Sequence, residues 1–441
     1  MIQLSDHFGY KRLLQFTLPT IVMLMISSIY GVVDGYFVSN FVGKTPFTAI
    51  NFIMPFLLIL GSVGFMFGTG GGALIAKTMG EGNKQQANEQ FSLLVYTSAI
   101  CGILLAAIGI VALRPIASAM GASGQLLEDS VAYGRVVLLA IPAYIFQCQF
   151  QCLFATAEKP KLGLHVAIAA GVTNVILDAL LIVGFGWGLE GAAAATAIGQ
   201  CVGGIVPIFY FARPNSSLLR LGKAKFDGQV LFRAVTNGSS ELLTNITTSV
   251  VSILYNVQLL EYAGEDGVAA YGVLLYVNLV FQAVFIGYSV GTAPVISYHY
   301  GSQNCDELKG LRKKSLIIIS TFAVCMFLAA QLLAKPISLI FVGYDAGLLN
   351  MTRHAFGIYA FMFLFFGFGV FGSGFFTALN DGLVSALIAF LRTLVFQIAA
   401  VLIFPLLWGL DGIWASLVAA ELLSTLMVVL FLVKKQKKYN Y

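Results

Sequence analysis

The sequence predicts an all-α polytopic membrane protein with twelve transmembrane helices in two six-helix lobes, and three observations support this class. Of the 441 residues, 59% are hydrophobic and 10% are charged, whereas about 25% of the residues of a typical soluble domain are charged. Apolar stretches of about 20 residues, enough to cross a bilayer as a helix, recur along the chain. The two halves of the sequence also repeat one another at a constant offset, as an internal duplication would.

Twelve apolar stretches are long enough to be transmembrane spans. They cover residues 13–39, 47–76, 91–113, 130–157, 162–184, 189–212, 234–260, 268–298, 315–334, 351–379, 383–405 and 410–433. The polar start MIQLSDHFGYKR does not resemble a cleavable signal sequence, so we expect the N-terminus to be retained.

The basic residues outside the spans predict the orientation in the membrane. An even number of spans places both termini on one side. That side holds nineteen Lys and Arg residues against five on the other, with Arg392 left out because it lies within a span. Since Lys and Arg are enriched in cytoplasmic loops, both termini are expected in the cytoplasm. The expected location is the cell membrane, as a multi-pass protein of a bacterial cytoplasmic membrane.

A shift of 221 positions superposes the halves of the sequence without gaps. Gly80 then meets Gly301, and WGLEG at 187–191 meets WGLDG at 408–412. Six helices in each copy give both copies the same orientation. This predicts a pseudo-twofold axis along the membrane normal and a cleft between the lobes that closes alternately at either face. The predicted divisions are an N-terminal lobe of residues 1–212, a cytoplasmic linker of residues 213–233 and a C-terminal lobe of residues 234–441.

Asp34 and Asp178 are acidic residues within predicted spans, and the repeat duplicates neither of them. A charged Asp in the hydrocarbon region costs roughly 2.5–3.5 kcal/mol on insertion scales, so it usually faces a cavity, a partner or an ion. The two residues lie at similar depth in the first and fifth spans, and Asn174 is one helical turn from Asp178. This pattern predicts a cation site, although hydrogen bonds to neighbouring helices would explain it as well.

Two carboxylates in a poorly solvated pocket cannot both remain charged at low cost. One of the two acids should therefore hold a proton unless a cation such as Na⁺ neutralises the pair. Such a pair is suited to coupling transport to an ion gradient.

The seventh span carries a polar stripe at helical spacing from Glu241 to Tyr255. Together with polar residues of the fourth and eighth spans, this stripe is expected to line the cleft and contact the substrate. Hydrogen bonds between helices are the alternative reading of the same pattern. The predicted cleft residues are Gln147, Gln151, Glu241, Asn245, Tyr255, Asn278 and Gln282.

Arg392 and Glu421 are predicted to form an ion pair with a structural role. They lie in the eleventh and twelfth spans, which run in opposite directions, so both residues come to similar depth near the membrane centre. An unpaired charge at that depth would be costly, and pairing reduces the cost.

Other classes of function find little support in the sequence. The six cysteines have no zinc-like spacing, and GGALIAKT at 71–78 has Ala76 where a phosphate-binding loop requires Gly. The basic residues are dispersed instead of forming one patch for nucleic acid. We therefore expect neither a nucleic-acid partner nor a cofactor, and we expect H⁺ or Na⁺ as the coupling ion.

The Asp34 segment, NVILD at 174–178, MGEGNK at 79–84 and the six-plus-six repeat together resemble the multidrug and toxic compound extrusion (MATE) family of transporters. The resemblance covers essentially the whole chain. It implies an antiporter that exports amphipathic, mostly cationic drugs and toxic organic compounds in exchange for H⁺ or Na⁺. The expected partners are small organic cations and membrane lipids, and the expected state is a monomer.

The resemblance also implies a cation site in the N-terminal lobe. In one branch of the family this site uses residues that match Asp34, Asn174, Asp178 and Thr196, which could hold H⁺ or Na⁺, with a Tyr that matches Tyr30. The other branch uses acidic residues on helices 7 and 10. Helix 7 here has Glu241, but residues 351–379 contain no Asp or Glu, which argues against a complete second ion site.

Two alternative functions remain open at this point. A flippase for a lipid-linked precursor would need a more basic cleft to hold phosphate. A membrane-embedded enzyme would need a His-rich metal set or a nucleophile with its base, and the sequence shows neither pattern.

Overall fold

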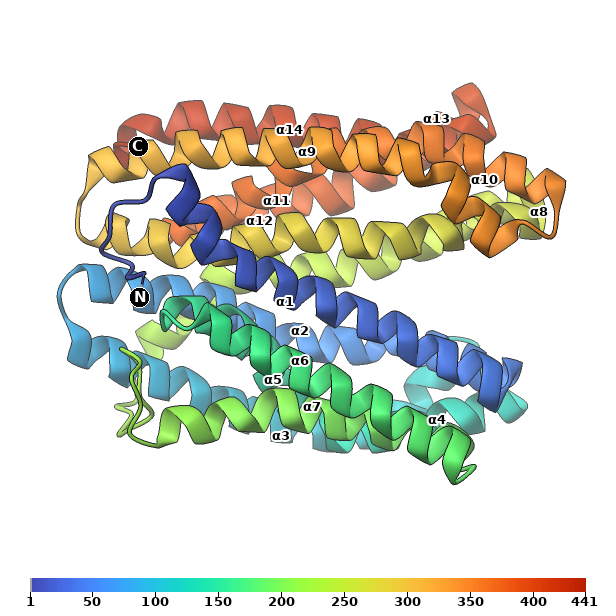
Figure 1. The fold of residues 1–441 in the computed structure, drawn as a ribbon, viewed down its shortest axis with the longest axis horizontal. Helices are drawn as coiled ribbons and strands as arrows, with labels where there is room; N and C mark the ends of the chain where they lie inside the picture. The colour runs from blue at the N-terminus through green and yellow to red at the C-terminus, as the bar shows by residue number, and fades with distance from the viewer. Residues whose placement is uncertain (1) are drawn as a thin grey trace.

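The computed structural model describes residues 2–441 as two bundles of helices that lie side by side, with both termini at the same end of the molecule (Figure 1). The N-terminal bundle consists of α1 (Tyr10–Phe37), η1 (Val38–Val42), α2 (Lys44–Gly80), α3 (Lys84–Ala119), α4 (Gly124–Leu139), α5 (Ile141–Thr156), α6 (Pro160–Leu177), η2 (Asp178–Gly184) and α7 (Gly188–Ala212). The C-terminal bundle consists of α8 (Gly228–Gly301), α9 (Cys305–Val342), α10 (Ala346–Tyr359), η3 (Ala360–Met362), α11 (Phe363–Ala378), α12 (Gly382–Phe390), η4 (Leu391–Phe396), α13 (Gln397–Trp408) and α14 (Leu410–Tyr439).

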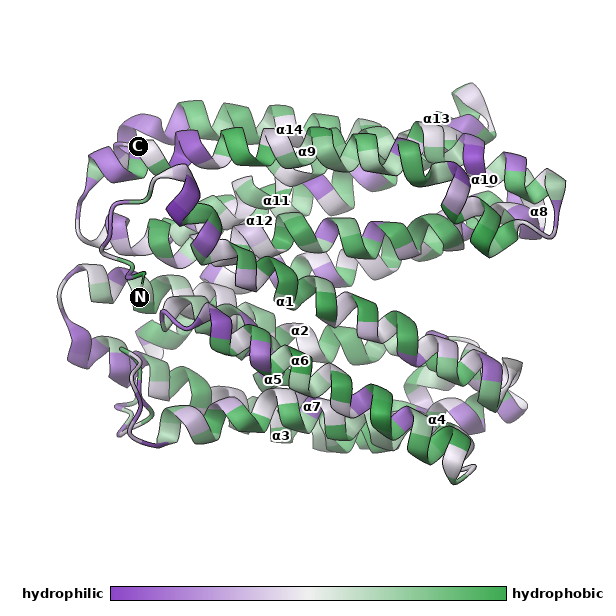
Figure 2. Ribbon diagram, in the orientation of Figure 1, coloured by the Kyte–Doolittle hydropathy of each residue, from purple (hydrophilic) through white to green (hydrophobic). Residues whose placement is uncertain are grey.

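The described helices provide the twelve spans that the sequence predicts. Ten of them are long and apolar enough to cross a membrane, and α4 with α5 forms one further span that bends by 60°. The long helix α8 changes direction at Gly264, where φ is 63° and ψ is −151°, so it contributes two spans. Glycine adopts this backbone conformation without steric cost. Hydrophobic residues cover the middle of the helices, whereas hydrophilic residues gather mainly towards their ends (Figure 2).

The connection between the bundles has no helix between residues 213 and 227 and lies against α3. Asn88 of α3 accepts a hydrogen bond from the backbone N–H of Arg220 at 2.7 Å, and Tyr96 donates to the carbonyl oxygen of Gly222 at 2.9 Å. Helix α8 then begins at Gly228, six residues before the expected position 234. The reason is a cap, because the side chain of Asp227 accepts the N–H groups of Gln229 and Val230.

Glycines bring the backbones of the two bundles into direct contact near the terminal end. A Cβ on Gly80 of α2 would lie 2.0 Å from the carbonyl oxygen of Tyr298, and one on Gly301 would lie 2.1 Å from that of Lys77. The two contacts are equivalent under the 221-residue shift, because Gly80 corresponds to Gly301 and Lys77 to Tyr298. Only glycine fits so close an approach, so the repeated glycines build the interface between the lobes.

The N-terminal segment also joins the bundles at this end. The N–H of Leu4 donates to Glu158, between α5 and α6, at 2.6 Å. The N–H of Phe8 donates to Glu307 in the first turn of α9 at 2.9 Å, and His7 Nδ1 lies 2.6 Å from the same carboxylate. Residues 4–8 therefore connect one bundle to the other.

The glycine contact can be tested by filling it. We expect Gly301→Ala to destabilise the protein by about 1–3 kcal/mol, because the new methyl group overlaps the backbone of Lys77. The measurement is the midpoint temperature of thermal unfolding in detergent. The matched control is Gly272→Ala on the same helix, where no atom lies within 4 Å of the added Cβ. Equal stability of the two variants would contradict a tight interface at Gly301.

Candidate functional site

Asp34 lies near the end of α1, where the hydrogen-bonding pattern changes from an α-helix to the π-helical segment η1. The N–H of Val38 is shared between the carbonyl oxygens of Asp34 and Gly35. Single π-helical turns of this kind are frequent at functional sites. The carboxylate of Asp34 is buried, and the hydroxyl of Thr196 in α7 donates to it at 3.4 Å.

Asp178 is the first residue of a second π-helical segment, η2, and its side chain has no exposed surface. Its carboxyl lies close to that of Asp34, and Asn174 lines the same cavity as Asp34. Within residues 2–441 neither carboxylate oxygen of Asp178 has a hydrogen-bond donor. Two carboxylates can hydrogen-bond to one another only if one of them carries a proton, so this arrangement favours a shared proton or a bound cation.

The structure thus brings Asp34, Asn174, Asp178 and Thr196 together, as the sequence predicts for the cation site. All four offer oxygen atoms, which are the ligands that hard cations such as Na⁺ prefer. No cluster of three or more His, Cys, Asp or Glu side chains suited to a metal ion occurs in the described part of the chain.

A cavity inside the N-terminal bundle gives access to Asp34. It is lined by Ser27, Tyr30, Asp34, Tyr133, Asn174 and Thr196, among others. Asp178 does not line this cavity, so an ion that enters it meets Asp34 before Asp178. The sequence did not predict Tyr133 as a site residue, because the predicted residues were acids and polar pairs at helical spacing. A lone Tyr in the fourth span gives neither signal, and the hydroxyl of Tyr133 faces the site only because α4 packs against α7.

Gln147 and Gln151 of α5 hold the same face of α1. Gln147 donates to the hydroxyl of Tyr30 at 3.2 Å, and Gln151 donates to Ser27 at 3.4 Å. Both Gln residues line a cleft between the bundles, together with Gln282 and Ile286 of α8. The cleft shares Ser27, Tyr30 and Gly31 with the cavity at Asp34. The cavity and the cleft are therefore adjacent.

A second cavity lies inside the C-terminal bundle. Of the predicted cleft residues, Glu241, Tyr255, Asn278 and Gln282 line it. Asn245 does not, because its amide donates at 2.8 Å to the carbonyl oxygen of Glu241 one turn earlier. Asn245 was expected in the cleft. Its position shows that the polar stripe of α8 includes side chains that hydrogen-bond within the helix as well as side chains that line the cavity. Gln282 and Ile286 belong to both this cavity and the cleft.

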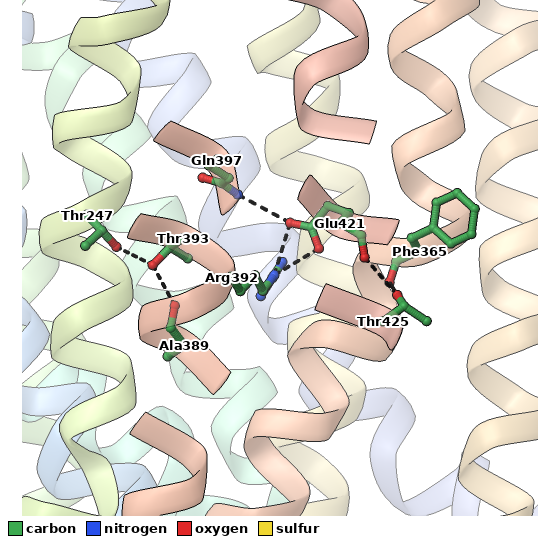
Figure 3. A network of polar contacts seen from close by, with 8 residues as sticks. All are labelled: Thr247, Phe365, Ala389, Arg392, Thr393, Gln397, Glu421 and Thr425. Carbon is green, nitrogen blue, oxygen red and sulfur yellow. Dashed lines mark hydrogen bonds and ion pairs between the residues drawn. The ribbon is translucent and has the colours of Figure 1, made fainter. Parts of the chain in front are cut away.

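Arg392 and Glu421 lie in contact in the wall of this second cavity (Figure 3). The Nε atom of Arg392 is 3.0 Å from Oε1 and 2.9 Å from Oε2 of Glu421, and Gln397 donates to Oε1 at 3.4 Å. The guanidinium lies over the ring of Phe366 at 4.5 Å. Gly369 leaves room for it, since a Cβ there would lie 2.9 Å from Nε. Arg392 belongs to η4, the third π-helical segment.

Two lobes of six spans each, with polar cavities beside a cleft between them, are the architecture of a secondary transporter. The MatE family model matches residues 19–180 and 242–403, one match in each bundle. The chain therefore belongs to the MATE family.

Curated relatives and solved structures agree with this assignment. The chain is 26% identical to the multidrug export protein MepA of Staphylococcus saprophyticus, over 96% of this chain and 94% of the relative. It is also 26% identical to MepA of one Staphylococcus aureus strain, with the same coverage. Among solved structures, a MATE in complex with MaL6 gives a TM-score of 0.93 at 19% identity, covering 98% of both chains. A multidrug resistance MATE family transporter in an outward-facing conformation gives 0.92 at 19% identity, covering 98% of this chain and 97% of the other.

The energetic role of the buried ion pair can be measured directly. We expect Arg392→Gln to destabilise the protein by about 3–5 kcal/mol, because it leaves the buried carboxylate of Glu421 without a cation. The double variant Arg392→Gln/Glu421→Gln should recover most of this loss, since it leaves no unpaired charge. Thermal unfolding in detergent compares the three proteins. A double variant as unstable as the single one would show that the pair does not act as a unit.

Proposed function

We propose that this protein is an antiporter that exports amphipathic, mostly cationic drugs in exchange for H⁺ or Na⁺ by alternating access. The observation that carries this proposal is the pair of neighbouring carboxyls, Asp34 and Asp178, buried in a membrane-spanning bundle beside a cavity that adjoins the cleft. Drug export is supported by relatives that are named multidrug export proteins and that match the chain over almost its full length.

The orientation follows from the excess of Lys and Arg at the end that holds both termini. We place this end in the cytoplasm, because cytoplasmic loops of membrane proteins carry an excess of Lys and Arg. The lobes touch at this end through Gly80 and Gly301, whereas the cleft residues of α1 begin at Leu24, beyond the contact that Thr17 makes with Gly291. The structure then corresponds to a state closed on the cytoplasmic side.

The ion acts by changing the charge of the carboxyl pair. A proton or Na⁺ from outside reaches Asp34 through the cleft and the cavity, and it removes the repulsion between the two carboxylates. This lets α1 and α6 pack more closely at their π-helical segments. Because Ser27 and Tyr30 of α1 also line the cleft, the movement alters the substrate surface and favours release. Each charge that moves inward contributes roughly 2.3 kcal/mol per 100 mV.

The composition of the cleft favours a drug exporter over a flippase for a lipid-linked precursor. Among the described residues that line the cleft, none is Lys or Arg. A phosphate group would find no positive partner there, whereas the Gln side chains and aromatic rings suit an uncharged or cationic amphiphile. The relatives are transporters, which fits the expectation that the protein is not an enzyme.

The decisive experiment measures uptake of a fluorescent cation into inverted vesicles under separately imposed pH and Na⁺ gradients. We expect one gradient to drive uptake by the wild type, and Asp34→Asn and Asp178→Asn each to abolish most of it, because a single remaining carboxyl has no neighbouring carboxylate whose repulsion the ion could relieve. Glu265→Gln, an exposed acid at the opposite bundle, is the matched control. Ion-driven uptake by both Asn variants at the wild-type rate would overturn the proposal.

Glu241 provides a separate test of substrate contact. Its carboxyl lines the second cavity and could hold a cationic group of the substrate. We expect Glu241→Gln to weaken the binding of cationic substrates by about tenfold, the loss expected for one charged hydrogen-bond partner. The binding of an uncharged analogue should change little. Unaltered affinity for every cation tested would remove Glu241 from the substrate site.

A further inference from the structure

A groove lies between the first turns of α1 and the start of α6, at the end of the molecule that holds both termini (Figure 1). Its volume is about 810 Å³, and its lining includes Arg12, Phe16, Leu18, Lys159, Lys161 and Leu162. Within residues 2–441 it shares no lining residue with the cleft or with the two cavities inside the bundles. The groove is therefore separate from the proposed transport path.

Basic side chains predominate in the lining of this groove. Arg12, Lys159 and Lys161 are basic, and Glu158 is the one acid among the described lining residues. A carboxyl oxygen of Glu158 accepts the N–H of Leu4 at 2.6 Å. The basic groups outnumber the acid whether or not Glu158 is ionised, so the groove attracts an anion.

The protein satisfies these basic groups only in part. Arg12 donates to Asp6 at 2.5 Å, which is its one hydrogen bond within residues 2–441. That pair is partly exposed, so water weakens it, and the guanidinium keeps donors for a second partner. Lys159 donates to the neutral hydroxyl of Ser216 at 3.0 Å. Lys161 is exposed and forms no ion pair with the described residues.

The first turn of α6 adds a second source of positive potential to the groove, because residues 160–162 belong to its lining. The N-cap of α6 is Lys159, and no side chain accepts a hydrogen bond from the first turn there. The N–H groups at the start of a helix carry partial positive charge, and phosphate is a frequent ligand of such groups. The helix start and the basic side chains therefore favour the same kind of ligand.

The groove continues into the apolar outer surface of both helices. Leu18 of α1 lines the groove and is 55% exposed, and the exposed Ile29 lies on the same face of α1 three turns further along. On α6 the exposed Ile168 and Val172 lie on the same face as Lys161. A ligand with a charged head and apolar chains would cover both kinds of surface, whereas a small soluble anion would cover only the first.

We propose that this groove binds an anionic phospholipid, whose phosphate group lies among Arg12, Lys159 and Lys161 and whose acyl chains lie along α1 and α6. Basic pockets between membrane helices recognise the head groups of anionic lipids by this combination of charge and apolar surface. The inference does not depend on the proposed antiport, because the groove contains no residue of the cation site or of the cleft. A lipid bound here contacts both α1 and the start of α6, so it stabilises the packing of these two helices.

The test measures lipid binding to the full-length protein by native mass spectrometry from a neutral maltoside detergent. The probes are dioctanoyl phosphatidylglycerol, which is anionic, and dioctanoyl phosphatidylcholine, which has the same acyl chains but no net charge. We expect the wild type to bind phosphatidylglycerol more tightly than phosphatidylcholine. Arg12→Gln/Lys161→Gln should weaken phosphatidylglycerol binding by about tenfold and remove this preference, because two basic partners of the phosphate are lost.

Control variants separate the groove from the general positive charge of the terminal end. Lys309→Gln/Lys313→Gln removes two exposed basic residues of α9 outside the groove and should bind both lipids as the wild type does. Arg12→Lys/Lys161→Arg keeps both charges and should keep the preference for phosphatidylglycerol. The single variant Lys161→Gln, which breaks no described ion pair, provides the measurement if the double variant does not fold. An equal loss in the α9 variant, or no loss in the groove variants, would overturn the site.

A second comparison distinguishes a lipid from a soluble phosphate. Inorganic phosphate and glycerol phosphate carry the anionic group without acyl chains, and each is added to the wild-type complex with phosphatidylglycerol at the concentration of the lipid. We expect neither to displace the lipid, because neither covers the apolar surface beside Leu18. Displacement by either compound would show that the groove binds a soluble anion, and the lipid assignment would then be wrong.

Discussion

The cost of placing a charge in hydrocarbon is the constraint on which the interior of this protein depends. The ionisable groups Asp34, Asp178, Arg392 and Glu421 all lie within membrane-spanning segments and are buried. Each of them turns inward to a partner: the two Asp carboxyls face each other, and Arg392 pairs with Glu421. Lipid cannot stabilise such charges, so each bundle builds a polar interior around its own set, and these interiors become the cavities.

The two bundles differ in how their buried ionisable groups are paired. In the N-terminal bundle both groups are acids, so the proposed antiport assigns a mobile cation or proton to this pair. In the C-terminal bundle the cation is the side chain of Arg392, so the pair is neutral without any ligand. The duplicated framework of helices and glycines therefore carries two interiors of different charge, a pair of acids in one and a neutral ion pair in the other.

All three π-helical segments of the chain as described adjoin or contain one of these charged residues: η1 begins four residues after Asp34, η2 begins at Asp178, and η4 includes Arg392. A π-helical turn leaves backbone groups less regularly bonded than an α-helix does. The π-helical segments thus lie beside the cavities, and the close glycine contacts of Gly80 and Gly301 lie at the terminal end.

The sequence by itself determined the twelve spans, the two lobes and the residues that could carry charge in the membrane, because these follow from hydrophobic length, the 221-residue repeat and the rarity of acids in apolar stretches. It also supplied the pairing of Arg392 with Glu421, since depth in antiparallel spans is fixed by residue count. Only the tertiary structure decided that Tyr133 lines the cavity at Asp34, that Asn245 bonds to its own helix and that Arg392 and Glu421 lie in the wall of a cavity. Those facts depend on how helices rotate and bend against one another, and the periodicity of a single sequence does not record the rotation.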